Sequence, residues 1–80
     1  MNIEERFFKI FSDVMEVDYE KKHYSMSTLR QWDSLKTIEL IMELQKEFSI
    51  KFNHRDIIKL TDTKNIIEII SKYKDGEDLL

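Results

Sequence analysis

The scarcity of turn-forming residues is the feature that most constrains the fold of this chain. Its 80 residues include no proline and one glycine, and a multi-stranded sheet with tight turns needs more of both. Hydrophobic residues make up 41% of the sequence, and they recur at helical spacing rather than in strict alternation. We therefore predict an all-α fold with one hydrophobic core, so that residues 1–80 form a single domain.

A first helix is predicted from Ile3 to about Val17. Asn2 followed three residues later by Glu5 resembles a capping box, which satisfies free backbone N–H groups at a helix start. Five apolar residues then recur at helical spacing: Ile3, Phe7, Ile10, Phe11 and Val14. The phenylalanines at positions 7, 8 and 11 could line a ligand pocket, but in a small bundle we interpret them as core.

The periodicity lapses over residues 18–32, which predicts a long connection. Such a connection needs anchors in a compact domain, and Tyr24, Met26 and Leu29 are the apolar residues that could pin it. Trp32 closes the segment. We interpret it as a hydrophobic staple packed over the start of the next helix, a role compatible with contacting a partner protein.

A second helix is predicted from Lys36 to Phe48, with Asp33 as its cap and Ser34 at the first helical position, its hydroxyl in solvent. At about 100° per residue, the helix has two apolar faces. The face expected in the core consists of Leu40, Ile41, Leu44 and Phe48. The second face, beside the serine, consists of Leu35, Ile38 and Met42. It is either a docking surface or part of one broad buried face.

Two further helices complete the predicted fold. Asn53 with Asp56 indicates a short helix over roughly residues 54–59, and Thr61 or Asp62 caps a last helix over about residues 63–73. That last helix is expected to bury Ile66, Ile67, Ile70 and Tyr73. Gly76 suits the exit from the helix, and residues 75–80 are expected to fray. The prediction is a four-helix bundle of three main helices and a short third one, with a long loop between helices one and two.

Charge and composition exclude several functional classes. Thirteen basic and 16 acidic residues give a net charge of −3 without a basic stripe, which argues against nucleic acid as a partner. The apolar runs are too short for a transmembrane segment, and the first residues do not resemble a signal peptide. We expect a cytoplasmic monomer. The lack of cysteine excludes disulfides and a cysteine nucleophile.

The chain also lacks the residue groups that an enzyme acting alone requires. A serine hydrolase needs a histidine base and an oxyanion hole, yet His23 and His54 have no evident partners and Gly76 is the only glycine. Clustered metal ligands and glycine-rich phosphate loops are likewise absent from the sequence. What remains is Ser34 beside an apolar stripe, a combination that fits a protein modified at the serine and passed between partners.

Several segments together resemble the acyl carrier protein family. They are Trp32-Asp33-Ser34-Leu35, Ile38-Glu39-Leu40, Glu47-Phe48 and the stretch from Ile57 to Leu60-Thr61. The match covers nearly the whole chain. It implies that Ser34 carries 4′-phosphopantetheine, transferred from coenzyme A by a phosphopantetheinyl transferase, and that acyl groups are held as thioesters on the prosthetic thiol. It also implies a carrier rather than an enzyme.

The resemblance further implies which partners dock and where. Besides the transferase, they are an acyl-loading ligase or acyltransferase and a downstream synthase or transferase. They are expected to dock on the helix that follows the serine, at Asp33, Leu35, Ile38, Glu39, Met42, Glu43 and Glu47.

The sequence departs from fatty-acid carriers at several positions. Trp32 precedes the Asp-Ser-Leu motif, and Lys36, Gln45 and Lys46 stand where those carriers are often acidic. This pattern favours a carrier of a specialised pathway, such as polyketide, nonribosomal peptide, aminoacyl or polysaccharide modification. A fatty-acid carrier is the alternative, and a helical interaction module without a prosthetic group is an alternative of another class.

Overall fold

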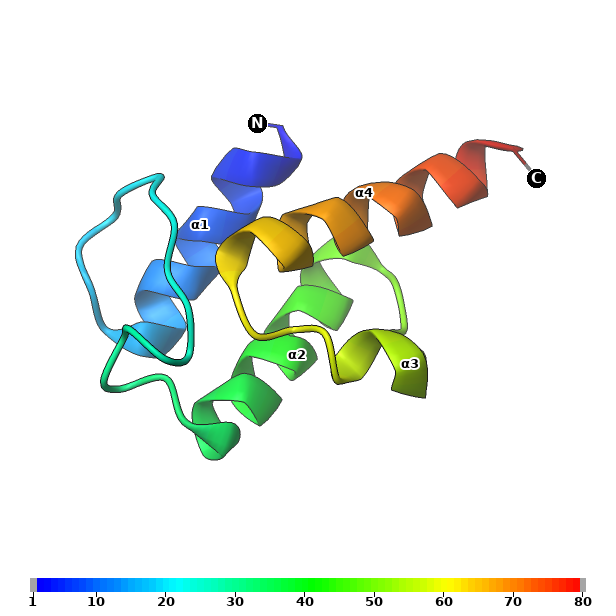
Figure 1. Cartoon of the computed structure of the whole chain (residues 1–80). Helices are drawn as coiled ribbons and strands as arrows, with labels where there is room; N and C mark the ends of the chain where they lie inside the picture. Colours follow the sequence, from blue (N-terminus) through cyan, green and yellow to red (C-terminus); the bar gives the residue numbers. More distant parts are fainter. Residues whose placement is uncertain (1, 80) are drawn as a thin grey trace.

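The computed structural model describes residues 2–79, with side chains described for residues 2–74. Four helices follow one another along the chain, with no strand in the described part: α1 (Ile3–Met15), α2 (Ser34–Phe48), α3 (His54–Ile57) and α4 (Thr63–Leu79). Figure 1 shows α1, α2 and α4 as the three main helices, with α3 as a single short turn between α2 and α4 along the chain. The predicted all-α bundle with a short third helix and a long first loop is confirmed.

A side-chain cap begins each helix. In every case an Asn or Asp oxygen accepts a hydrogen bond from the backbone N–H three residues on, at 2.7 to 2.9 Å, which satisfies one free donor. The caps of α1, α2, α3 and α4 are Asn2, Asp33, Asn53 and Asp62. The predicted caps are confirmed, and Asp62 rather than Thr61 serves α4.

Left-handed residues end α1 and α2. Glu16 has φ 57° and Ser49 has φ 53°, and their backbone N–H groups donate to the carbonyls of Ser12 and Gln45. Bonds of this kind satisfy the free carbonyls of a last turn. The closure at Glu16 places the end of α1 two residues before the predicted boundary at Val17.

The core forms where the three main helices meet. Among residues 2–74, thirteen hydrophobic side chains are buried there: Phe7, Phe8, Phe11, Met15, Trp32, Leu40, Leu44, Phe48, Phe52, Leu60, Ile66, Ile69 and Ile70. The three phenylalanines of α1 are core, as predicted, and their rings contact one another at centroid distances of 5.0 to 6.3 Å. The first face of α2 is also core, with Ile41 partly buried at its edge.

The last helix is longer than predicted. It runs through Gly76 to Leu79, so the expected end near Tyr73 is wrong. One glycine inside a helix costs only about 1 kcal/mol relative to alanine, which lowers helix stability without ending the helix. Ile69 is buried although it was not predicted, whereas Ile67 and Tyr73 are only partly buried. The prediction that residues 75–80 fray falls on a part of the chain where the side chains of residues 75–79 and the whole of residue 80 lie outside the described part.

The long loop is pinned to the start of α4. The Met26 N–H donates to the Thr61 carbonyl and the Thr63 N–H donates to the Tyr24 carbonyl, both at 2.9 Å. The buried Thr63 hydroxyl also accepts from the Tyr24 N–H at 3.1 Å. Tyr24, Met26 and Leu29 pack against the core, so the predicted anchoring is confirmed. Within the described residues, no helix combines the length and the apolar character needed to cross a membrane.

Candidate functional site

Ser34 is the first residue of α2, and its side chain is exposed. Asp33 caps the helix through its Oδ1, which accepts from the Lys36 N–H at 2.9 Å. This bond directs the Asp33 carboxylate toward the helix backbone, and the side chain of Ser34 lies on the outside of the bundle. Among the described residues, none makes a hydrogen bond with the Ser34 hydroxyl, so this oxygen is available to an incoming group.

A small hydrogen-bonded network holds this helix start in place. The Trp32 Nε1–H donates to the Thr37 hydroxyl at 2.9 Å, and that hydroxyl donates to the Asp33 carbonyl at 3.0 Å. The Trp32 ring is 2% exposed and lies edge-on against Phe11, with 5.3 Å between ring centroids. The interpretation of Trp32 as a staple is confirmed, and its burial leaves little surface for a partner.

The second apolar face of α2 lies outside the core. Leu35 is 65% exposed, Ile38 55% and Met42 56%, whereas Leu40 and Leu44 on the other face are at most 1% exposed. The alternative of one broad buried face is therefore wrong. We call Leu35, Ile38 and Met42 the exposed stripe. Large apolar side chains exposed next to one another are typical of interaction surfaces.

The acidic residues predicted to accompany the stripe are in different environments. Glu39 and Glu43 are exposed and lie 3.6 and 3.8 Å from Lys36 and Lys46, each three residues away on the same helix. Pairs of this kind contribute little stability. These two carboxylates therefore remain accessible beside the stripe.

Glu47 differs from the other two acids because it is tied to α1. Its carboxylate accepts from the Arg6 Nε at 2.8 Å, and its backbone carbonyl accepts from the Arg6 Nη2 at 2.8 Å. The same guanidinium lies 4.5 Å from the centre of the Phe48 ring. Glu47 therefore takes part in the contact between α1 and α2.

Ile58 is an exposed apolar residue that the sequence prediction missed. It is 76% exposed at the end of α3, next to the partly buried Ile57. The available signal was the pair of adjacent isoleucines, because neighbouring residues on a helical turn point about 100° apart and a short turn that packs on one side only need not bury both.

The histidines form no catalytic group with Ser34. His23 is exposed in the long loop, with its Nε2 3.8 Å from Asp62 Oδ1, and His54 is exposed at the start of α3. In the part of the chain that the structure describes, no three His, Asp or Glu side chains are grouped so as to hold a metal ion.

Comparison with known proteins identifies close relatives. The "Acyl carrier protein" of Buchnera aphidicola subsp. Acyrthosiphon pisum (strain APS) is 36% identical over 73 residues, covering 89% of this chain and 91% of the relative. That of Buchnera aphidicola subsp. Schizaphis graminum (strain Sg) is 33% identical over 72 residues, covering 88% and 91%. No family model matches the sequence. With this identity over nearly the full length of both chains, the chain belongs to the acyl carrier protein family and is a carrier rather than an enzyme.

Proposed function

We propose that Ser34 carries 4′-phosphopantetheine and that the protein delivers acyl groups held as thioesters on that arm. The observation that carries the proposal is the exposed hydroxyl of Ser34, without a partner among the described residues, directly after the Asp33 cap. Because the chain belongs to the carrier family, we assign this serine as the attachment site of the prosthetic group. The bound group supplies the thiol that the chain itself lacks, since the sequence contains no cysteine.

The position of Ser34 suits an attached phosphate. The first N–H groups of an α-helix have no partner within the helix, and the helix dipole places partial positive charge at this end. A phosphodiester on Ser34 would lie at the N-terminus of α2, which has 15 residues. The Thr37 hydroxyl, which accepts from Trp32 and donates to the Asp33 carbonyl, holds the backbone next to the attachment site.

Modification uses the serine as nucleophile. The Ser34 oxygen attacks the phosphorus of coenzyme A that bears the pantetheine, and the new O–P bond replaces the P–O bond of the pyrophosphate bridge. Adenosine bisphosphate leaves with the electron pair of that bond, and the transferase takes up the serine proton. The neighbouring Asp33 carboxylate accepts from the Lys36 N–H, and among the described residues no group hydrogen-bonds the Ser34 hydroxyl, so the proposed reaction relies on a base of the transferase.

The exposed stripe is the proposed docking surface for the partner enzymes. These are the phosphopantetheinyl transferase, a loading ligase or acyltransferase, and a downstream synthase or transferase. Apolar contact would come from Leu35, Ile38 and Met42, and Glu39 and Glu43 would attract basic residues. Asp33 and Glu47 belong to the same proposed surface, and the exposed Glu47 carboxylate also pairs with Arg6.

We further propose that the pathway is a specialised one rather than bulk fatty-acid synthesis. Lys36 lies 3.6 Å from Glu39 and 3.9 Å from Glu16, and Lys46 lies 3.8 Å from Glu43, so cations of the same helix offset the acids of α2. A basic partner surface built for a strongly acidic helix would be attracted less. The holo-protein should accept malonyl groups slowly from the malonyl transferase of fatty-acid synthesis, and Lys36→Glu combined with Lys46→Glu should raise that rate.

Intact mass spectrometry tests the modification itself. The protein is incubated with coenzyme A, Mg²⁺ and a promiscuous phosphopantetheinyl transferase, and the expected mass gain equals one phosphopantetheine group. Peptide mapping should place it on Ser34. Ser34→Ala should show no gain, whereas the control Ser27→Ala, in the long loop, should be modified like the wild type. Modification of Ser34→Ala would refute the site, and an unmodified wild type would favour an interaction module without a prosthetic group.

A further inference from the structure

A groove of about 380 Å³ lies between α1, the long loop and the start of α4. Its floor is largely apolar, because Phe8 is buried, Ile67 is partly buried and Thr63 is 1% exposed. None of the described residues that line it comes from α2 or belongs to the proposed docking surface. A ligand can therefore bind here while the exposed stripe stays free.

Hydrogen bonds hold the loop wall of this groove against α4. The Tyr24 N–H donates to the Thr63 hydroxyl at 3.1 Å, and the Thr63 N–H donates to the Tyr24 carbonyl at 2.9 Å. The Thr63 hydroxyl also donates to the Lys22 carbonyl at 3.5 Å. Figure 1 shows the loop passing beside the start of α4. The loop residues Lys21, Lys22 and His23 are thus held at the groove by a fixed backbone.

The exposed rim of the groove carries more positive than negative charge, so we call it the basic groove. Three lysines line it against two glutamates, and they are Lys21, Lys22, Lys64, Glu4 and Glu68. Lys21 lies 4.0 Å from Glu4, and Lys22 lies 3.2 Å from Glu20 outside the groove. All four side chains of these pairs are about half exposed, so each pair neutralises its lysine only weakly.

Lys64 has no evident role in the stability of the fold. It is exposed in the first turn of α4, where a cation opposes the helix dipole and does not stabilise the helix. None of the ion pairs in the described part of the chain includes it. Its charge is therefore available to an anionic group in the basic groove.

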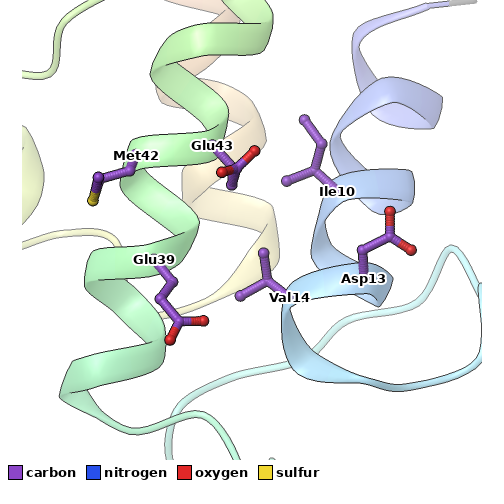
Figure 2. Close-up of a pocket in the computed structure, with 6 residues that line it drawn as sticks. All are labelled: Ile10, Asp13, Val14, Glu39, Met42 and Glu43. Atoms are coloured by element: carbon purple, nitrogen blue, oxygen red, sulfur yellow. The ribbon is translucent and has the colours of Figure 1, made fainter.

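The groove between α1 and α2 has the opposite charge. Six residues line it, three of them carboxylates and none a cation: Ile10, Asp13, Val14, Glu39, Met42 and Glu43 (Figure 2). Met42 also belongs to the exposed stripe, so this groove adjoins the proposed docking surface. A partner segment that is attracted to one groove is therefore repelled by the other.

We propose that the basic groove binds a short acidic segment of a partner protein, which tethers the carrier while α2 stays free to dock. The inference rests on the proposed carrier function. An aliphatic side chain of the segment would pack on Phe8 and Ile67, and its carboxylates would meet the lysines of the rim. Tethering raises the effective concentration of the carrier near the enzymes that it serves. An anionic membrane is a poorer match, since Glu4 and Glu68 would face it as well.

The test uses the full-length protein before modification and a peptide that contains the sequence Asp-Asp-Leu-Asp-Asp. Protein labelled at methyl groups and backbone amides is titrated with the peptide at low and high salt. We expect saturable shifts at the Ile67 methyl groups and the amides of residues 21–23, none at the Met42 methyl group, and binding that weakens as salt rises. Lys64→Gln should weaken binding about two- to fivefold, the range expected for losing one exposed ion pair.

Matched controls separate the basic groove from general attraction. Lys51→Gln removes the same charge from an exposed position between α2 and α3 and should leave binding unchanged. A peptide with asparagine in place of every aspartate should not bind. Equal weakening by Lys64→Gln and Lys51→Gln would overturn the proposal, as would shifts centred on α2.

Two further measurements test the tethering role and the other possible occupants. Modification of Ser34 by the transferase, followed by mass, should proceed equally fast with and without saturating peptide, because α2 stays free. A slower rate would overturn tethering, whereas no modification in either case would refute the carrier function while the titration still decides the groove. Shifts at the groove with phosphatidylglycerol vesicles and not with the peptide, or dimerisation through the groove without peptide, would also overturn the proposal.

Discussion

At the scale of single residues, Ser49 adopts a backbone conformation that disfavours its own side chain. It has φ 53° and is exposed, and its N–H closes α2 on the Gln45 carbonyl. A residue with a Cβ pays about 1 to 2 kcal/mol in this region, and glycine does not. We expect Ser49→Gly to raise the free energy of unfolding by about 0.5 to 1 kcal/mol, after the greater freedom of unfolded glycine is subtracted. Urea denaturation measures the change.

The control for this prediction is Ser49→Ala. Alanine keeps the Cβ and therefore the unfavourable conformation, so its stability should stay close to that of the wild type. If alanine stabilised the protein as much as glycine, the cause would lie in the serine side chain and not in the backbone.

Thr37 is the second residue whose replacement is informative, because its hydroxyl is the acceptor for the buried Trp32 Nε1–H. Thr37→Val keeps the shape but removes the acceptor, and a buried donor without a partner costs about 1 to 3 kcal/mol. Denaturation followed by the fluorescence of the single tryptophan should show this loss. Thr37→Ser retains a hydroxyl and should lose clearly less stability. Equal losses would show that the methyl packing of Thr37 matters and the hydrogen bond does not.

At the scale of the element, α2 has one face in the core and another in solvent. Leu44 is 0% exposed and Met42 is 56% exposed. Leu44→Ala should therefore cost about 2 to 5 kcal/mol as a core truncation, and Met42→Ala below about 1 kcal/mol. Met42→Ala should nevertheless slow transfer to or from a partner enzyme, since Met42 belongs to the proposed docking surface.

Charge reversal complements this pair of variants. Glu39→Lys and Glu43→Lys should reduce transfer rates in a salt-dependent manner, because attraction to a basic partner is lost. Denaturant melts and transfer rates are measured on these two variants and on Leu44→Ala and Met42→Ala. Together they test whether the exposed stripe is the docking surface. Were Met42→Ala to leave transfer per folded molecule unchanged, the docking surface would have to lie elsewhere on the protein.

At the scale of the whole molecule, Tyr73 links α4 to the start of α3. Its hydroxyl donates to Asp56 Oδ2 at 2.7 Å and accepts from the Asn53 N–H at 2.9 Å. Burial, followed by the bond to Asp56, raises the pKa of Tyr73. Because the pKa of Tyr73 is higher in the folded than in the unfolded protein, its protonated hydroxyl contributes to the free energy of unfolding. That contribution is fully present below the pKa of tyrosine in the unfolded chain, about 10, and is lost as the pH rises through the pKa in the folded protein.

We therefore expect the wild type to lose more stability than Tyr73→Phe between neutral pH and pH values above about 10. The variant should be less stable at neutral pH, because it lacks both hydrogen bonds. Urea melts of both proteins at the two pH values give the loss of unfolding free energy in each. Subtracting one loss from the other removes the contribution of lysines that titrate in the same range, because both proteins contain the same lysines. Tyr19→Phe, which removes an exposed hydroxyl, should match the wild type. A pH dependence identical in wild type and Tyr73→Phe would contradict the assignment.

The sequence by itself determined the features that depend on residues close together along the chain, namely the helix caps and the faces of the helices. Caps work over three residues and helical faces repeat every turn, so Asp33, the position of Ser34 and the separation of the two faces of α2 could be read without a structure. Helix ends were less certain. Closure at Glu16 uses a left-handed non-glycine residue, and α4 continues through its glycine, both against local preference.

Only the tertiary structure decided which surfaces meet. The engagement of Glu47 by Arg6 joins residues 41 positions apart, and the pairing of the long loop with residues 61–63 spans a similar distance. The groove at Ile10 and Met42 likewise exists only because α1 packs beside α2. Such contacts depend on how helices pack and not on local periodicity, because the same amphipathic helices could pack in several ways. The sequence thus identified the serine and its helix, and the packing of α1 against α2 determined the surroundings in which a partner would meet them.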